Sequence, residues 1–126
     1  PLVIFDVGHN VSGIRCFLNE FSSIKCAGKK MLIIALQSQK NIKQIIPLIE
    51  KEFDLILCTQ TANKHSMPSE KLRNQFSSHS SIKQKNSIQK SILETLRFAE
   101  KSDIIAIIGS HYIGPAIREI FEISFD

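Results

Sequence analysis

Four unbroken apolar runs restrict the folds open to this chain more than any other feature of its sequence. They cover residues 2–5, 31–36, 55–57 and 104–108 and consist almost entirely of Leu, Ile, Val, Met and Phe. A strand with one solvent-facing side alternates polar and apolar residues, whereas a strand that is buried on both sides is apolar throughout. The runs therefore predict strands of a parallel sheet that is covered by helices.

Between the runs, apolar residues recur at the three- and four-residue spacing of helices with one buried face. Strands that alternate with helices in this way predict an α/β domain with right-handed crossovers. We therefore expect a three-layer, Rossmann-like fold with a mostly parallel sheet and helices on both faces. The apolar positions of the expected helices are Ile14, Phe17, Leu18 and Phe21; Ile42, Ile45, Ile46 and Ile49; Leu72 and Phe76; Ile88, Ile92, Leu96 and Ala99; and Ile113, Ala116, Ile117, Ile120 and Phe121.

Local signals indicate where some of these elements begin and end. Pro47 lies inside an apolar stripe and is expected to kink or split that helix, because proline lacks an amide hydrogen and clashes with the preceding turn. Pro115 is expected in the first turn of the last helix. Asn86 is the expected N-cap of the helix that ends near Lys101. A short strand is expected around Ile82.

Length and charge narrow the class of protein. A chain of 126 residues predicts one domain. No apolar run approaches the roughly 20 residues that cross a bilayer, and the first residues do not resemble a secretory signal. The net charge of +4 comes from scattered lysines, so we expect a solvated surface and neither nucleic acid nor a membrane as partner. Because the chain begins with Pro1 directly on a strand, we expect residues 1–126 to be a fragment of a longer polypeptide.

The three cysteines form no CxxC pair and no metal-ligand spacing, so no metal site is expected. Their odd number favours a reducing compartment, which predicts a cytoplasmic protein. Cys16 and Cys58 are expected to be small buried hydrophobic residues. His65 and His79 lie in polar loops without a carboxylate or cysteine partner at ligand spacing, and we expect them to be exposed.

The polar turn after the first apolar run is the main candidate for a functional site. It carries Asp6, His9 and Asn10, and ligands of open α/β sheets bind at the carboxyl ends of the strands. A carboxylate there accepts hydrogen bonds from ribose hydroxyls or metal-bound water, and an imidazole donates to a phosphate oxygen. The next helix offers amide hydrogens and a positive dipole end to an anion. The alternative is that Asp6 caps the turn and His9 is an exposed loop residue.

Other phosphate-binding patterns are missing from the sequence. It contains neither GxxxxGK[ST] nor GxGxxG, which argues against a P-loop or a dinucleotide-binding turn within this chain. A response-regulator receiver is unlike this chain, since no acidic residue ends the third strand. The turn at residues 109–112 follows the last strand, and the residue pattern favours a structural role for it, with Ser110 as a cap.

The segment at residues 6–10 reads Asp-Val-Gly-His-Asn and resembles the Asp-Gly-Ala-His-Asn-Pro signature that opens the C-terminal domain of folylpolyglutamate synthases and bifunctional dihydrofolate synthases, members of the Mur-ligase superfamily. Residues 107–114 are similar to the late Thr-Gly-Ser-Leu-Tyr segment of these enzymes, and Arg118 follows at a compatible distance. The chain departs from the signature at Val7, Gly8 and Val11, and His111 replaces an apolar residue of the late segment.

The resemblance implies an ATP-dependent amide ligase that adds glutamate to a folate or dihydropteroate through an acyl phosphate. Residues 1–126 would be its single C-terminal domain, while ATP and Mg²⁺ are held mainly by a central P-loop domain absent here. The C-terminal domain closes over the nucleotide and is inactive alone. Asp6 and His9 would be catalytic, with Asp6 facing the ribose and His9 the γ-phosphate. Asn10 would hold the loop or contact the nucleotide, and Ser110 and Tyr112 would bind substrate.

Two other interpretations remain open from the sequence. The missing P-loop and the short length are also typical of a stand-alone Rossmann-like module that binds a nucleotide or a protein. Alternatively, the chain is the C-terminal domain of a different Mur-type ligase, such as one that builds peptidoglycan. Only the match of the turn at His9 argues against this last interpretation.

Overall fold

The computed structural model describes residues 1–7, 10–38, 40–109 and 111–122. No helix in these ranges is both long and apolar enough to cross a membrane. The helices and strands follow one another as β1 (Leu2–Asp6), α1 (Val11–Phe21), β2 (Lys30–Ala35), α2 (Ile46–Glu52), β3 (Leu55–Cys58), α3 (Ser69–Arg73), β4 (Ile82–Gln84), α4 (Ile88–Phe98), β5 (Ile104–Gly109), the 3₁₀ turn η1 (His111–Ile113) and α5 (Gly114–Phe121).

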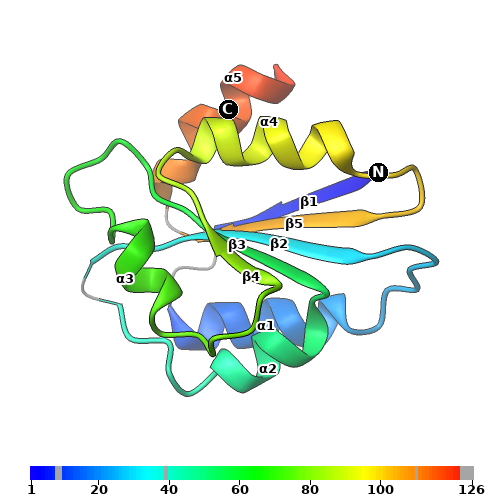
Figure 1. Cartoon of the computed structure of the whole chain (residues 1–126), viewed down its shortest axis with the longest axis horizontal. Helices are drawn as coiled ribbons and strands as arrows, with labels where there is room; N and C mark the ends of the chain where they lie inside the picture. Colours follow the sequence, from blue (N-terminus) through cyan, green and yellow to red (C-terminus); the bar gives the residue numbers. More distant parts are fainter. Residues whose placement is uncertain (8–9, 39, 110, 123–126) are drawn as a thin grey trace.

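The strands form a parallel sheet with the order β1-β5-β2-β3-β4 (Figure 1). The last strand in the chain, β5, therefore lies between β1 and β2. Its register places Ile108 beside Asp6 and Gly109 beside Ala35. The carboxyl ends of β1, β5 and β2 consequently lie level with one another along one edge of the sheet.

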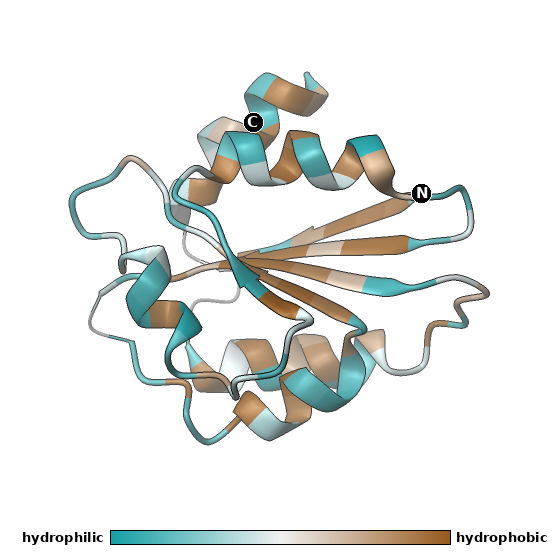
Figure 2. Cartoon of the chain, viewed as in Figure 1, coloured by the Kyte–Doolittle hydropathy of each residue, from teal (hydrophilic) through white to brown (hydrophobic). Residues whose placement is uncertain are grey.

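Helices cover both faces of the sheet, which confirms the expected three-layer α/β architecture. Helices α1 and α2 lie on one face, and α4 and α5 lie on the other (Figure 1). Alternate strand residues supply two apolar cores: Ile34 and Ile108 belong to the core beneath α1 and α2, whereas Ile33 and Ile107 belong to the core beneath α4 and α5. All four side chains are fully buried. Figure 2 shows the same layering, with hydrophobic strands between helices in which hydrophobic and hydrophilic residues alternate.

Pro47 splits the second apolar stripe. Helix α2 begins at Ile46 with the proline in its first turn, where a missing amide hydrogen costs no intrahelical hydrogen bond. Ile42 and Ile45 precede the helix, yet both are fully buried beside Ile49 in the same core. The stripe therefore predicts burial correctly over its whole length, but only its second half is helical.

The boundaries of α4 differ from the sequence-based expectation. Its N-cap is Ser87, whose Oγ accepts a hydrogen bond from the Lys90 amide at 3.3 Å. The prediction that Asn86 caps this helix was therefore wrong. The Asn86 Oδ1 instead accepts a hydrogen bond from the Ser69 hydroxyl at 2.8 Å. The helix ends at Phe98 rather than near Lys101, since the chain turns there toward β5.

The two cysteine predictions have different outcomes. Cys58 is fully buried at the end of β3, and desolvation raises the pKa of its thiol to about 12. Cys16 is exposed, so the prediction that it is buried was wrong. The reason is its position in α1, where the buried face is formed by Ile14, Phe17 and Leu18. Helical position outweighs the general tendency of cysteine to be buried.

The Asp103 carboxylate ties the amino ends of the strands together. Its Oδ1 accepts a hydrogen bond from the Lys29 amide and its Oδ2 accepts one from the Glu100 amide, both at 2.8 Å. These backbone hydrogen bonds, that of Lys29 first, hold the pKa of Asp103 below its ordinary value of 3.8. A carboxyl with a lowered native pKa stabilises the fold above its unfolded pKa, and this contribution is lost as the pH falls through the native value.

We therefore expect the melting temperature to fall as the pH drops below the ordinary carboxyl value. The variant Asp103→Asn is expected to melt lower than wild type at neutral pH but to show a flatter decline in acid, because its side chain cannot be protonated in this range. Thermal unfolding followed by circular dichroism across the acid range measures both effects. If the melting temperatures of the two proteins fell in parallel as the pH dropped, the acid sensitivity would come from other carboxyl groups.

Candidate functional site

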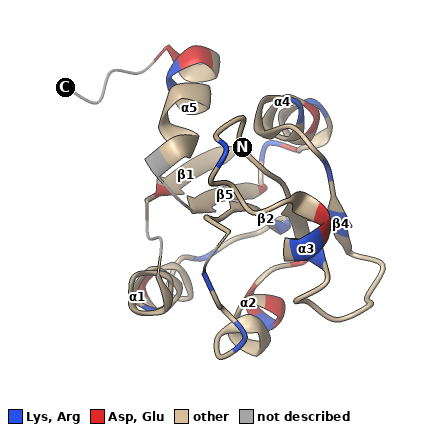
Figure 3. Cartoon of the chain, turned by 90° about the vertical axis from the view of Figure 1, so that its left-hand side faces the viewer, with Lys and Arg blue, Asp and Glu red and all other residues tan. Residues whose placement is uncertain are grey.

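Asp6 is the last residue of β1 and is half-buried at the carboxyl edge of the sheet. Strand alternation places it on the same side as Ile4, which packs against the core beneath α1. Figure 3 looks onto this edge, where the end of β1 lies between α1 and α5. The carboxylate therefore occupies the position expected from the sequence, at a strand end and beside the start of the following helix.

The fold brings together the two turns that carry the sequence motifs. One turn follows β1 and the other follows β5, and these two strands are neighbours with Asp6 in register with Ile108. Segments separated by about 100 residues in the chain thus leave the sheet side by side. Ligands of open α/β sheets bind at the carboxyl ends of the strands, so a ligand at the end of β1 would also lie beside the end of β5.

Asn10 is the N-cap of α1. Its backbone is extended, with φ −133° and ψ 172°, and its Oδ1 accepts a hydrogen bond from the Gly13 amide at 2.8 Å. The side chain thereby satisfies one of the amide groups that a helix leaves unpaired at its start. Of the two roles considered for Asn10, holding the loop is the one that these contacts show.

Replacing Asn10 by alanine is expected to destabilise the domain by about 1 kcal/mol, because the Gly13 amide loses its acceptor. Asn10→Asp keeps a capping oxygen and is expected to retain wild-type stability while losing the amide donor. Urea unfolding of the three proteins measures the difference. Equal midpoints for wild type and Asn10→Ala would show that the cap contributes nothing.

Two of the site residues expected from the sequence, His9 and Ser110, lie outside the described residues. Their assignments remain predictions. Tyr112 lies in the short turn η1 with 38% of its surface exposed, close to the carboxyl end of β5. Its place in the turn after β5 is compatible with the expected contact to a substrate and leaves that contact untested.

The structure adds a cavity that the sequence analysis did not anticipate. It has a volume of about 310 Å³ and lies between the end of β1 and the start of α5, where Phe5, Val7, Ile117 and Arg118 contribute to its wall. Phe5 and Val7 alternate with Asp6, so the cavity lies on the opposite side of β1 from the carboxylate. Period-two alternation predicts that Phe5 and Val7 share one side of the strand, but only the strand order of the folded sheet shows that α5 lies on that side.

The buried polar residue at the end of β3 has a structural role. The Thr59 side chain is fully buried and its Oγ1 accepts a hydrogen bond from Ser91 Oγ at 2.9 Å. His65 and His79 are exposed, as expected, and the His79 ring lies 2.7 Å from the Ser81 hydroxyl. Within the described ranges, no three His, Cys, Asp or Glu side chains lie close enough together to hold a metal ion.

Comparison with known proteins identifies relatives of this domain. Residues 1–111 match the family described as Mur ligase, glutamate ligase domain. The chain is 26% identical over 110 residues to a dihydrofolate synthase/folylpolyglutamate synthase of Buchnera aphidicola, which corresponds to 87% of this chain and 26% of that protein. It therefore spans about a quarter of the length of this curated relative.

Solved structures agree with this match at the level of the fold. The bifunctional folylpolyglutamate synthase/dihydrofolate synthase of Yersinia pestis superposes with a TM-score of 0.84 at 19% identity, covering 98% of this chain and 29% of that one. FolC of E. coli gives a TM-score of 0.83 at 18% identity, with 95% and 28% covered. Since the family match extends over residues 1–111, the chain belongs to the Mur ligase family as a glutamate ligase domain.

Proposed function

We propose that this chain is the C-terminal domain of an ATP-dependent ligase that joins glutamate to a folate or dihydropteroate. The observation that carries the proposal is the placement of the two family-like turns after the adjacent strands β1 and β5. If the strands before these two turns were not neighbours, the turns could not contribute to one binding site. The three free thiols are compatible with the cytoplasmic location that we propose for the enzyme.

The ligands of related structures support this substrate class. The Yersinia pestis enzyme was solved with AMPPNP and a manganese ion, and E. coli FolC was solved with DHPP and ADP. A further bifunctional folylpolyglutamate synthase/dihydrofolate synthase was solved with manganese, AMPPNP and L-glutamate. We carry over to this chain a nucleotide, glutamate and a folate or dihydropteroate as small-molecule ligands of the whole enzyme.

In the proposed enzyme, Asp6 accepts hydrogen bonds from the nucleotide ribose and His9 donates to the γ-phosphate. The half-buried carboxylate at the end of β1 suits the first role, since it is partly desolvated yet open to the sheet edge. A donor aimed at phosphate oxygens stabilises charge that develops during phosphoryl transfer. Asn10 keeps the start of α1 in place behind these groups, while Ser110 and Tyr112 face the substrate.

Binding of the metal is assigned to the central domain that this chain lacks. The described part of the chain gathers no group of three His, Cys, Asp or Glu side chains that could hold a metal ion. When bound, the metal would neutralise phosphate charge. This chain closes over the nucleotide and excludes water from it, as mobile domains of many enzymes do.

The experiment is an assay of ATP-dependent incorporation of labelled glutamate by the full-length protein, with dihydropteroate and tetrahydrofolate as separate acceptors. We expect incorporation with at least one acceptor and none from residues 1–126 alone. Incorporation only with a peptidoglycan precursor would transfer the chain to another branch of Mur ligases. Submicromolar nucleotide binding by the isolated chain would favour a stand-alone module.

A further inference from the structure

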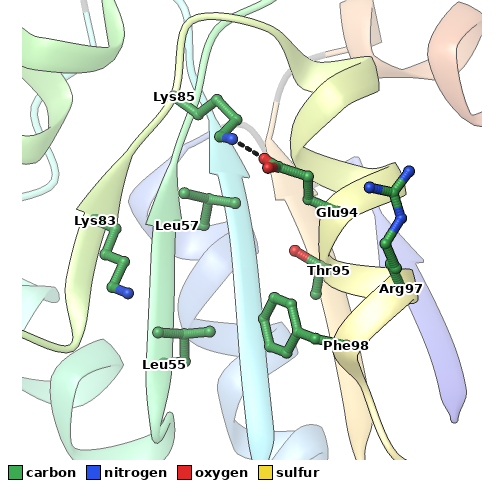
Figure 4. Close-up of a pocket in the computed structure, with 8 residues that line it drawn as sticks. All are labelled: Leu55, Leu57, Lys83, Lys85, Glu94, Thr95, Arg97 and Phe98. Atoms are coloured by element: carbon green, nitrogen blue, oxygen red, sulfur yellow. Dashed lines mark ion pairs between the residues drawn. The ribbon is translucent and has the colours of Figure 1, made fainter.

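A second cavity, remote from the candidate site, lies between α4 and the outer strands of the sheet. It has a volume of about 340 Å³ and is drawn in Figure 4. Leu55 and Leu57 of β3 form its floor and Phe98 of α4 forms one end of its helical wall. Basic residues stand on both sides, with Lys83 on β4 and Arg97 on α4. We refer to this cavity as the α4–β4 groove.

The groove exists because the two faces of the sheet are covered unequally. On β3, Ile56 and Cys58 face the core beneath α1 and α2 and are buried, whereas Leu55 and Leu57 face the other side and are half-buried. On that side α4 and α5 leave the strip above β3 and β4 partly open. Phe98 borders this strip and exposes 58% of its surface. An apolar surface of this kind, rimmed by charge, is typical of an interaction site.

The charges around the groove are unbalanced. Lys85 forms an ion pair with Glu94, drawn as a dashed line in Figure 4. Lys83 and Arg97 have no carboxylate partner within 4.0 Å in the part of the chain that the structure describes. The groove therefore keeps an excess of positive charge next to apolar side chains, and it complements a ligand that combines carboxylates with a bulky apolar group.

The outer edge of β4 is partly covered by Arg73. The Arg73 guanidinium donates hydrogen bonds to the carbonyl oxygens of Ile82 at 2.7 Å, Ser77 at 2.6 Å and His79 at 3.2 Å. The oxygen of Ile82 belongs to β4, so the arginine occupies one of the backbone groups with which another chain would pair. This contact disfavours an added strand and favours a partner that lies on the face of the sheet, in the groove, and is recognised through its side chains.

We infer that the α4–β4 groove binds an acidic peptide segment that inserts one large apolar side chain between Phe98 and Leu55. A peptide suits the groove, because its carboxylates can reach the basic residues on both sides while an apolar side chain contacts the leucines of the floor. Nucleic acid is disfavoured, since Phe98 is the single aromatic side chain among the described residues that line the groove, and successive bases would find no stacking platform there. The peptide carboxylates pair with Lys83 and Arg97 on the two walls.

The test uses the full-length protein and a short fluorescent peptide with a central phenylalanine flanked by glutamates. Fluorescence anisotropy is expected to show micromolar binding that weakens with added salt. Phe98→Ala and Lys83→Glu are each expected to weaken binding about tenfold, because one removes the apolar contact and the other reverses a charge. Both side chains are exposed, so the variants are expected to melt like wild type.

Matched controls come from the opposite face of the sheet, where Leu48 exposes 42% of its surface and Lys43 is exposed. Leu48→Ala and Lys43→Glu are expected to bind the peptide like wild type. The inference is overturned if all four variants bind equally, if a peptide with lysines in place of the glutamates binds as well, or if no peptide binds. Preferential binding of single-stranded oligonucleotide or phosphatidylserine vesicles would also overturn it.

Discussion

Replacing His9 with alanine in the full-length ligase is expected to lower kcat roughly 100-fold, the usual loss when one donor to a developing anion is removed. The proposed role of His9 is to donate to the γ-phosphate and its acyl-phosphate product, so the loss should appear in kcat rather than in folding stability. Steady-state glutamate incorporation gives kcat, and thermal unfolding of the same preparation gives stability.

An exposed histidine elsewhere in the chain provides the control for His9. His79 comes before β4, at the amino end of that strand and thus at the opposite edge of the sheet from Asp6, and its substitution by alanine is expected to leave turnover unchanged. His9→Ala with wild-type turnover would remove His9 from the chemistry. A loss of activity accompanied by a clearly lower melting temperature would show that the residue acts on the stability of the fold.

Replacing Gly109 with alanine is expected to destabilise the domain by about 3 kcal/mol or more. Gly109 has a φ of +142°, which side chains rarely adopt, and a Cβ at this position would lie 1.7 Å from the carbonyl oxygen of Ala35. The two residues are neighbours in adjacent central strands, so relief of this clash requires β5 and β2 to separate at the carboxyl edge. Urea unfolding measures the loss.

Gly114 is the matched control for Gly109, because a Cβ there would meet nothing within 4 Å. It is the first residue of α5, where alanine is a better helix former than glycine. Gly114→Ala is expected to be neutral or to stabilise by up to about 1 kcal/mol. Similar unfolding midpoints for the two variants would refute the argument from close backbone approach.

The sequence was sufficient to predict the layers of the fold, because burial on both faces leaves a direct mark on strands such as residues 31–36 and 104–108. Prediction of helix boundaries was less reliable where two neighbouring residues could both cap the helix. Asn86 and Ser87 are both good capping residues, and only the position of Ser69 decides which of them caps α4. Cys16 was misassigned because residue type was given more weight than position on the helix.

Prediction of the site was limited by topology. Strand order cannot be read from local patterns, so the sequence located the turns after β1 and β5 without showing that they are adjacent. The cavity beside Phe5 and Arg118 was missed for the same reason, since its walls come from opposite ends of the chain. The resemblance to a known family supplied the roles of Asp6 and His9, which no spacing rule could provide.

The central position of β5 has a consequence for how the protein is made. Strand β1 is bonded within the sheet to β5 alone, so it has no partner until the ribosome has released residue 109 and the bonded strands can meet. The rest of the sheet, from β2 to β4, pairs earlier and over shorter separations, which favours faster formation. The end of β1 that carries Asp6 is therefore paired last among the strands, and a chain cut short before β5 would carry Asp6 on an unpaired, apolar strand prone to aggregation.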